Sequence, residues 1–135
     1  DGEIAGWAIG CDLTRRDLQA AAKDKGRPWD AAKGFDHSAA ISHFIPLAEL
    51  HNTNNQGIHH CNFSLQKNGV EVQQGNTQMM IHNVDEIIAH VSQYFSLRIG
   101  DYIFTGTPAG VGPVAPGDEL CGILANQEMF RFHVR

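Results

Sequence analysis

The chain has 135 residues, with ten Lys and Arg against fifteen Asp and Glu and a formal net charge of −5. This acidic balance argues against binding to nucleic acids or anionic membranes, because both need a basic surface. Hydrophobic residues make up 42% of the chain, too many for a disordered protein, and no apolar run approaches the roughly 20 residues that cross a bilayer. The three cysteines are odd in number and far apart, which argues against a disulfide framework and favours a cytoplasmic setting.

The first part of the chain predicts a strand followed by a helix. Residues 4–13 form an apolar run, typical of a buried strand. Thr14, with Asp17 three positions later, resembles a capping box, and Gly26 is a natural terminator, so a helix is expected over residues 14–25. The polar start at residues 1–3 lacks an initiator Met, which indicates that the chain begins inside a longer protein.

A hairpin and a second helix are predicted in the middle of the chain. Residues 58–66 and 70–74 alternate in polarity around Asn68-Gly69, the strongest short signal for a hairpin. A capping box at Asn83 and Glu86 opens a helix that is expected to end near Leu97.

The last part of the chain predicts three strands. Residues 102–105 suggest a short strand, and residues 119–125 and 129–134 suggest a closing pair. Strands with two interspersed helices indicate a mixed α+β fold.

Asp12 is the first candidate for chemistry, because it lies at the end of the predicted buried strand, just before a helix. Carboxylate oxygens are the ligands that Mg²⁺ and Ca²⁺ prefer. Arg16 and Gln19 share a helix face three positions apart, so both could reach one ligand. A capped helix with an ordinary salt bridge explains the same residues without a ligand.

Two further candidates are a lysine and a glycine-rich loop. Lys33 is flanked by small and aromatic residues and could pair with a substrate carboxylate, although a solvated surface lysine fits the same pattern. Residues 106–112 contain three glycines that would let backbone N–H groups approach an anion, and Thr107 adds a hydroxyl. A simple tight turn is the alternative. The eight histidines show no recognised zinc-ligand spacing.

Taken in order, these segments resemble the fumarylacetoacetate hydrolase family, especially its small bacterial members related to acylpyruvate hydrolases. The likeness covers almost the whole chain and rests on these stretches: Gly10-Cys11-Asp12-Leu13-Thr14-Arg15-Arg16-Asp17-Leu18-Gln19, Gly26-Arg27-Pro28-Trp29, Ala32-Lys33-Gly34-Phe35-Asp36, Asn68-Gly69, Gln74-Gly75-Asn76-Thr77, Thr105-Gly106-Thr107-Pro108-Ala109-Gly110-Val111-Gly112 and Pro116-Gly117-Asp118. Ala39-Ala40 depart from the pattern, since relatives often carry Cys-Pro there.

The resemblance implies a role for each candidate. Asp12 resembles the third carboxylate ligand of a catalytic Mg²⁺ or Mn²⁺, whose other two ligands, an E-x-E pair, lie upstream in the family, as do the residues that activate water. Arg16, Gln19, Lys33 and Thr107 resemble the substrate contacts, with Lys33 also catalytic. The implied fold is a β-sandwich-like roll with a few helices, of which residues 1–135 would form the carboxy-terminal portion of one catalytic domain, and the implied assembly is a homodimer.

The function implied by the resemblance is metal-dependent hydrolysis of the C–C bond in 3-acylpyruvate-like 2,4-diketo acids, yielding pyruvate and a carboxylate. Oxaloacetate decarboxylation and keto–enol tautomerisation use similar chemistry and stay open, with a small 2-keto acid as substrate. A different possibility is a truncated, inactive fragment that survives as a dimerisation or scaffold unit. The upstream sequence would separate these readings.

Overall fold

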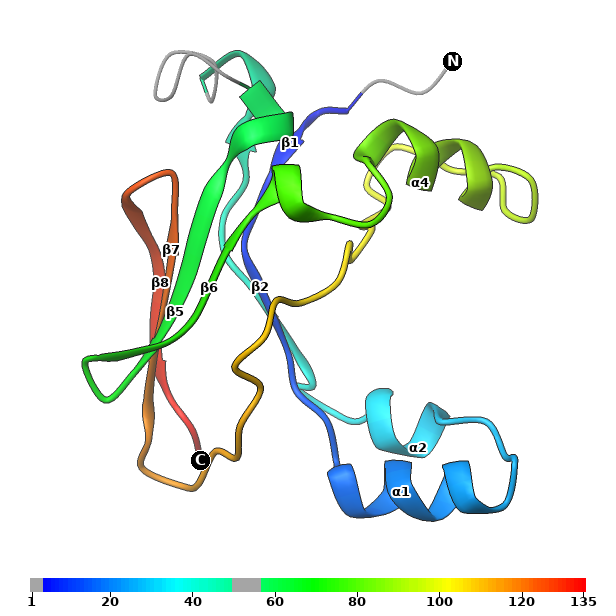
Figure 1. The fold of residues 1–135 in the computed structure, drawn as a ribbon, viewed down its shortest axis with the longest axis vertical. Helices are drawn as coiled ribbons and strands as arrows, with labels where there is room; N and C mark the ends of the chain where they lie inside the picture. The colour runs from blue at the N-terminus through cyan, green and yellow to red at the C-terminus, as the bar shows by residue number, and fades with distance from the viewer. Residues whose placement is uncertain (1–3, 50–56) are drawn as a thin grey trace.

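The computed structural model describes residues 4–49 and 57–135 and has a mixed α+β architecture, as the sequence predicts (Figure 1). Its main layer is a four-stranded antiparallel sheet in the order β6-β5-β7-β8, and two smaller two-stranded sheets pair β1 with β4 and β2 with β3. The elements are β1 (Gly6–Trp7), β2 (Gly10–Asp12), α1 (Arg16–Asp24), α2 (Asp30–Lys33), β3 (Ala39–Ile41), β4 (Ile45–Pro46), η1 (Gly57–His60), β5 (Asn62–Lys67), β6 (Val70–Asn76), η2 (Thr77–Met79), α4 (Val84–Val91), β7 (Glu119–Leu124) and β8 (Gln127–His133).

The central hairpin is confirmed, although its first strand begins at Asn62 and not at residue 58, because Gly57–His60 form the short helix η1. Strands β5 and β6 pair up to Lys67 and Val70, and the two residues between them, Asn68 and Gly69, have φ angles of 52° and 77°. Positive φ at both central positions is what a type I′ turn requires, and glycine adopts it without a steric cost. The closing pair of strands is also confirmed, since β7 and β8 are antiparallel.

The helix at Asn83 begins as predicted but ends early. The side chain of Asn83 accepts a hydrogen bond from the N–H of Glu86, and the carboxylate of Glu86 accepts one from the N–H of Asn83. Helix α4 ends at Val91 rather than near Leu97, and the N–H groups of Gln93 and Tyr94 bond to carbonyls only three positions earlier, as in a turn.

Two strand predictions are wrong. The apolar run over residues 4–13 is divided into β1 and β2, which pair with different partners. Residues 102–105 form no strand, and their rings pack against other elements: Tyr102 lies 4.9 Å from Phe44, centroid to centroid, and Phe104 lies against Gly10. Aromatic residues therefore produced a strand signal where the chain is a loop.

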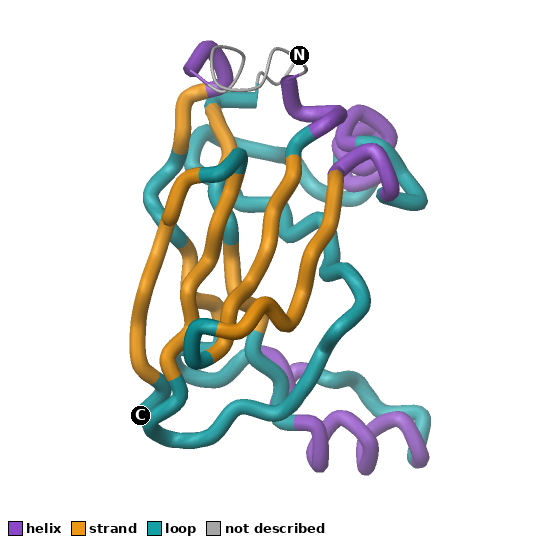
Figure 2. The backbone as a smooth tube through the Cα atoms, turned by 60° about the vertical axis from the view of Figure 1, so that its left-hand side comes forward, coloured by secondary structure: helices purple, strands orange, loops and turns teal. Residues whose placement is uncertain are grey.

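The hydrophobic core lies between the sheet, β4, η1 and α4. Its buried members are Ile45, Ile58, Cys61, Val84, Leu124 and Met129. Helices α1 and α2 lie at the opposite end of the molecule from α4 and connect to the rest through β2 and β3 (Figures 1 and 2). No helix in the described part of the chain is both long and apolar enough to cross a membrane.

Candidate active site

Asp12 lies at the end of β2, where the chain leaves the sheet and approaches helix α1. Its backbone pairs with Ala39 of β3, and the next residue, Leu13, donates its N–H to the carbonyl of Ser38 at 2.7 Å. These contacts fix the backbone, while the side chain of Asp12 stays 49% exposed. The predicted position of Asp12 at the end of a strand is therefore confirmed.

Helix α2 brings Lys33 to Asp12. The fully buried Ala32 accepts a hydrogen bond of 3.0 Å from the backbone N–H of Arg15, which docks α2 against the start of α1. The adjacent Lys33 then donates from Nζ to Oδ2 of Asp12 at 2.6 Å and to Oγ1 of Thr14 at 2.8 Å. An ammonium group has three N–H bonds, so one is left for a further acceptor.

The predicted capping role of Thr14 is wrong. Helix α1 begins at Arg16 with Arg15 at the N-cap position, and no side chain caps it. The hydroxyl of Thr14 instead accepts the hydrogen bond from Lys33. A charged donor such as Lys33 forms a stronger hydrogen bond than a backbone N–H does.

Arg16 and Gln19 lie together on α1, as their spacing predicts. Nη1 of Arg16 donates to Oε1 of Gln19 at 3.2 Å. Gln19 is only 7% exposed, whereas Arg16 is exposed. The buried amide thus holds a guanidinium whose remaining donors are available to an anion.

The glycine-rich loop crosses from β2 to β6. Phe104, just before it, lies against Gly10 of β2, and Gly110 lies against the backbone of Val72 in β6. Between them, Oγ1 of Thr107 accepts a hydrogen bond of 2.9 Å from Nε2 of Gln73. Thr107 has no hydrogen bond or ion pair with Asp12, Arg16, Gln19 or Lys33 among the described residues.

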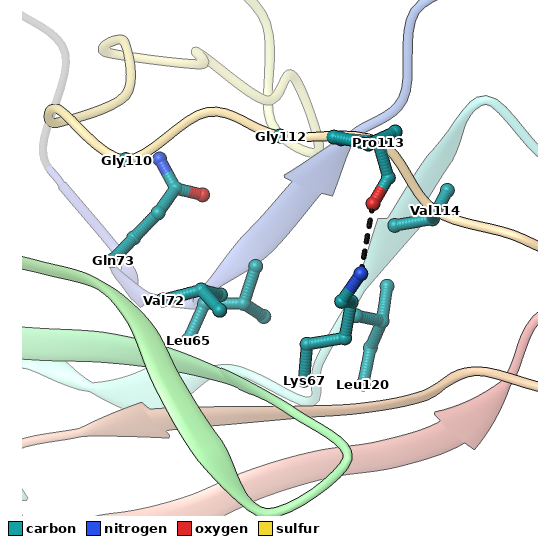
Figure 3. Close-up of a pocket in the computed structure, with 9 residues that line it drawn as sticks. All are labelled: Leu65, Lys67, Val72, Gln73, Gly110, Gly112, Pro113, Val114 and Leu120. Carbon is teal, nitrogen blue, oxygen red and sulfur yellow. Dashed lines mark hydrogen bonds between the residues drawn. The ribbon is translucent and has the colours of Figure 1, made fainter.

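A shallow cavity of about 110 Å³ lies between this loop and the main sheet (Figure 3). Lys67 of β5 extends across it and donates from Nζ to the carbonyl of Pro113 at 3.1 Å. Gln73 extends from β6 toward the loop at Gly110. Neither Lys67 nor Gln73 could be predicted as a site residue from the sequence, because single polar residues in a strand carry no local signal of a loop contact.

The carboxylate of Asp12 is one oxygen donor of the kind that a hard divalent cation prefers. The carboxylate has one oxygen bonded to Lys33 and a second oxygen without a protein donor among the described residues. Among residues 4–49 and 57–135, no three His, Cys, Asp or Glu side chains lie close enough together to form a metal-binding group. Burial raises the pKa of the neighbouring Cys11 thiol, and the charge of Asp12 raises it further, so this cysteine stays a neutral thiol.

Comparison with known proteins identifies the family. The model for the fumarylacetoacetate (FAA) hydrolase C-terminal family matches residues 2–131. The chain belongs to the fumarylacetoacetate hydrolase family. Its fold agrees with this, because a fumarylacetoacetate hydrolase family protein from Yersinia pestis superposes with a TM-score of 0.90 and 42% identity, over 98% of this chain and 60% of that one.

Relatives within the family are enzymes of differing activity. The chain is 46% identical to the oxaloacetate tautomerase YcgM of Escherichia coli, over 87% of its own length and 52% of YcgM. It is 44% identical to a fumarylpyruvate hydrolase of a Ralstonia species, over 88% of its own length and 59% of that protein. The chain thus spans little more than half the length of these relatives.

One family structure contains bound ligands. The fumarylpyruvate hydrolase of Pseudomonas aeruginosa, in complex with Mn²⁺ and pyruvate, is 39% identical and has a TM-score of 0.80, over 89% of this chain and 49% of that one. A member of the fumarylacetoacetate hydrolase family with this fold therefore binds a divalent cation and a 2-keto acid.

Proposed function

We propose that this chain is the carboxy-terminal part of a divalent-metal-dependent enzyme that hydrolyses 3-acylpyruvate-like 2,4-diketo acids. The observation that carries the proposal is the contact of Lys33 with both Asp12 and Thr14, which sets a cation beside a strand-end carboxylate. The overall reaction consumes one water, breaks the C–C bond between the two carbonyl-bearing fragments, and releases pyruvate and a carboxylic acid. Likeness to the Ralstonia fumarylpyruvate hydrolase supports it.

Asp12 would hold Mg²⁺ or Mn²⁺ through its carboxylate. A full negative charge at the end of a strand suits a hard cation, and such sites commonly use one or two carboxylates together with water and substrate. When bound, the cation supplies Lewis-acid stabilisation of the negative charge that develops on the 2-oxo oxygen. The remaining ligands would come from a part of the enzyme outside these 135 residues.

The cationic and hydroxyl side chains of this chain would bind and orient the acid. The third N–H of Lys33 would pair with a substrate carboxylate or with developing enolate charge. Arg16, held by the buried Gln19, would supply planar donors to a carboxylate. Thr107 would donate its hydroxyl to the substrate carboxylate from the glycine-rich loop. Fixing these donors before the reaction lowers the cost of ordering the substrate.

A second candidate function is oxaloacetate tautomerisation or decarboxylation. The specific observation that favours it is the 46% identity to the tautomerase YcgM. The same residues serve it, because oxaloacetate is also a 2-keto acid that passes through an enol. The reactions differ at the bound acid: hydrolysis adds water across a C–C bond, decarboxylation breaks a C–C bond and releases CO₂, and tautomerisation only moves a proton between carbon and oxygen.

An assay of the full-length gene product separates the candidates. Fumarylpyruvate and acetylpyruvate are offered for cleavage, and oxaloacetate is offered for tautomerisation and decarboxylation, each with Mg²⁺, with Mn²⁺ and with EDTA. Metal-dependent release of pyruvate from an acylpyruvate, faster than any oxaloacetate reaction, supports the hydrolase. Faster turnover of oxaloacetate supports the second function, and no turnover of either class supports an inactive scaffold.

We further propose that the enzyme works as a cytoplasmic homodimer. The cysteines support the compartment, since Cys11, Cys61 and Cys121 form no disulfide with one another in the structure. Multi-angle light scattering of the full-length product tests the assembly, and a monomeric mass at micromolar concentration would contradict it.

A further inference from the structure

The amide of Gln73 holds the loop that carries Thr107. Its Nε2 atom lies 2.9 Å from Oγ1 of Thr107 and 3.0 Å from the carbonyl oxygen of Pro108. Gln73 is half-buried in β6 and extends toward the loop rather than into solvent (Figure 3). One side chain therefore contacts both the hydroxyl and the backbone of the glycine-rich segment.

The chemistry of these two contacts fixes the direction of the hydrogen bond to Thr107. A carbonyl oxygen only accepts, so the atom of Gln73 that contacts Pro108 must be the amide nitrogen. That NH₂ group has two hydrogens, one for each partner. The oxygen of Thr107 consequently accepts, and its single hydroxyl hydrogen stays free to donate elsewhere.

We propose that Gln73 is a positioning residue that makes the Thr107 hydroxyl an obligate donor to the carboxylate of the bound keto acid. This rests on the proposed function, in which Thr107 contacts that carboxylate. A threonine hydroxyl without this contact can rotate and can either donate or accept. Some of its orientations therefore point the oxygen, and not the hydrogen, at an anion. The contact with Gln73 removes those orientations before the ligand arrives.

The rest of the loop is fixed strongly enough for this contact to matter. A Cβ atom added to Gly110 would lie 2.1 Å from the carbonyl oxygen of Val72, so the two backbones are in direct contact. At the far end, Lys67 donates to Pro113. Thr107 thus belongs to a segment attached to β5 and β6 at several points, and Gln73 sets the orientation of its hydroxyl within that segment.

The test measures binding of pyruvate to the full-length protein by isothermal titration in saturating Mn²⁺. Four proteins are compared with the parent: Gln73→Met, Thr107→Val, the double variant, and Gln74→Met as a matched control on the next, exposed residue of β6. We expect Gln73→Met and Thr107→Val each to weaken pyruvate binding by about 10-fold, the scale of one hydrogen bond to a charged group. Gln74→Met should leave it unchanged.

The double variant identifies the mechanism. If Gln73 acts through Thr107, then Gln73→Met weakens pyruvate binding no further in the Thr107→Val background. Gln73→Glu provides a second measurement, because its carboxylate would accept the hydroxyl hydrogen and could not donate to Pro108, so pyruvate should bind more weakly than in Gln73→Met. Mn²⁺ affinity without pyruvate should stay within twofold of the parent in Gln73→Met.

The failures are distinguishable. Additive losses in the double variant, or a Gln73→Met protein that binds pyruvate within twofold of the parent while Thr107→Val does not, would overturn the role of Gln73 and leave the proposed function standing. Unchanged pyruvate binding in Thr107→Val would overturn both the role of Gln73 and the carboxylate contact of Thr107.

Discussion

Nζ of Lys33 lies 2.6 Å from Oδ2 of Asp12, although 21 positions separate the two residues in the chain. Their side chains are 35% and 49% exposed, so solvent screens the pair and its contribution to folding is small, about 0–1 kcal/mol. Substitutions at either residue should therefore alter ligand binding much more than stability. Because effects on binding can be told apart from effects on folding, both residues are good targets for mutagenesis.

Replacing Asp12 with Asn should weaken binding of Mg²⁺ and Mn²⁺. The change removes a full charge from a hard-cation site and keeps the shape of the side chain. Losing a group that only orients a ligand costs about 10–100-fold in metal affinity, so losing a ligand itself should cost at least that much. Isothermal titration of the full-length protein measures it, with Asp17→Asn on the exposed side of α1 as the control. Equal metal affinity in the two variants would show that Asp12 is no ligand.

Replacing Lys33 with Met should lower kcat/KM by about 100-fold or more, which corresponds to about 3 kcal/mol. The loss follows from removing a positioned cation from the substrate and its transition state. Lys25→Met is the matched control, because Lys25 is exposed and has no side-chain hydrogen bond or ion pair within the described residues. Steady-state kinetics and thermal unfolding are measured together. If the Lys33→Met protein is folded and its kcat/KM stays within threefold of the parent value, Lys33 has no role in the reaction.

Replacing Gly110 with Ala should destabilise the protein by about 1–3 kcal/mol and weaken pyruvate binding. Gly110 has φ 99°, which other residues rarely adopt, and the new Cβ would lie 2.1 Å from the carbonyl oxygen of Val72. Gly112→Ala is the control in the same loop, because its nearest atom would be 4.0 Å away. Urea unfolding measures the difference, and similar unfolding free energies for the two variants would contradict the described backbone contact.

Stability should fall in acid through Asp118. Its carboxylate accepts hydrogen bonds from the side chain of Asn68 and the N–H of Ala115, which hold its pKa below the ordinary value. A lowered pKa in the folded state means that this contribution is complete above the ordinary pKa of about 4 and disappears as the pH falls through the folded value. Urea unfolding at several acidic pH values should therefore be less pH-dependent in Asp118→Asn. If the unfolding free energy depends on acidic pH in the same way in the variant and the parent, Asp118 makes no such contribution.

The parts of the fold that could be predicted from the sequence depend on neighbouring residues. Asn68-Gly69 forms its turn through local φ preferences, and Asn83 caps its helix through a residue three positions away. Thr14 shows the opposite case. Its local pattern predicts a cap, but Lys33, 19 positions later, takes the hydroxyl. A long-range charged partner is invisible in any local window.

In the candidate site, too, local contacts could be predicted from the sequence and long-range contacts could not. Arg16 and Gln19 could be paired by helix spacing, and the structure confirms their contact. The contact of Lys33 with Asp12 depends on docking of α2 against α1, and the sequence pattern did not predict the short helix at residues 30–33. Gln73 was missed for a related reason, since only the path of the loop across β6 brings Thr107 to it.

The contact between Gly110 and Val72 has a consequence beyond ligand binding. Strand β6 is an edge of the main sheet, and exposed edge strands invite pairing with strands of other molecules and hence aggregation. The glycine-rich loop lies against β6 and covers part of it. Under the proposed function, the same segment would both bind the keto acid and cover an edge strand, so substitutions in it would face two constraints at once. Light scattering of the Gly110→Ala protein tests the protection of the edge strand, because loss of that protection should appear as self-association.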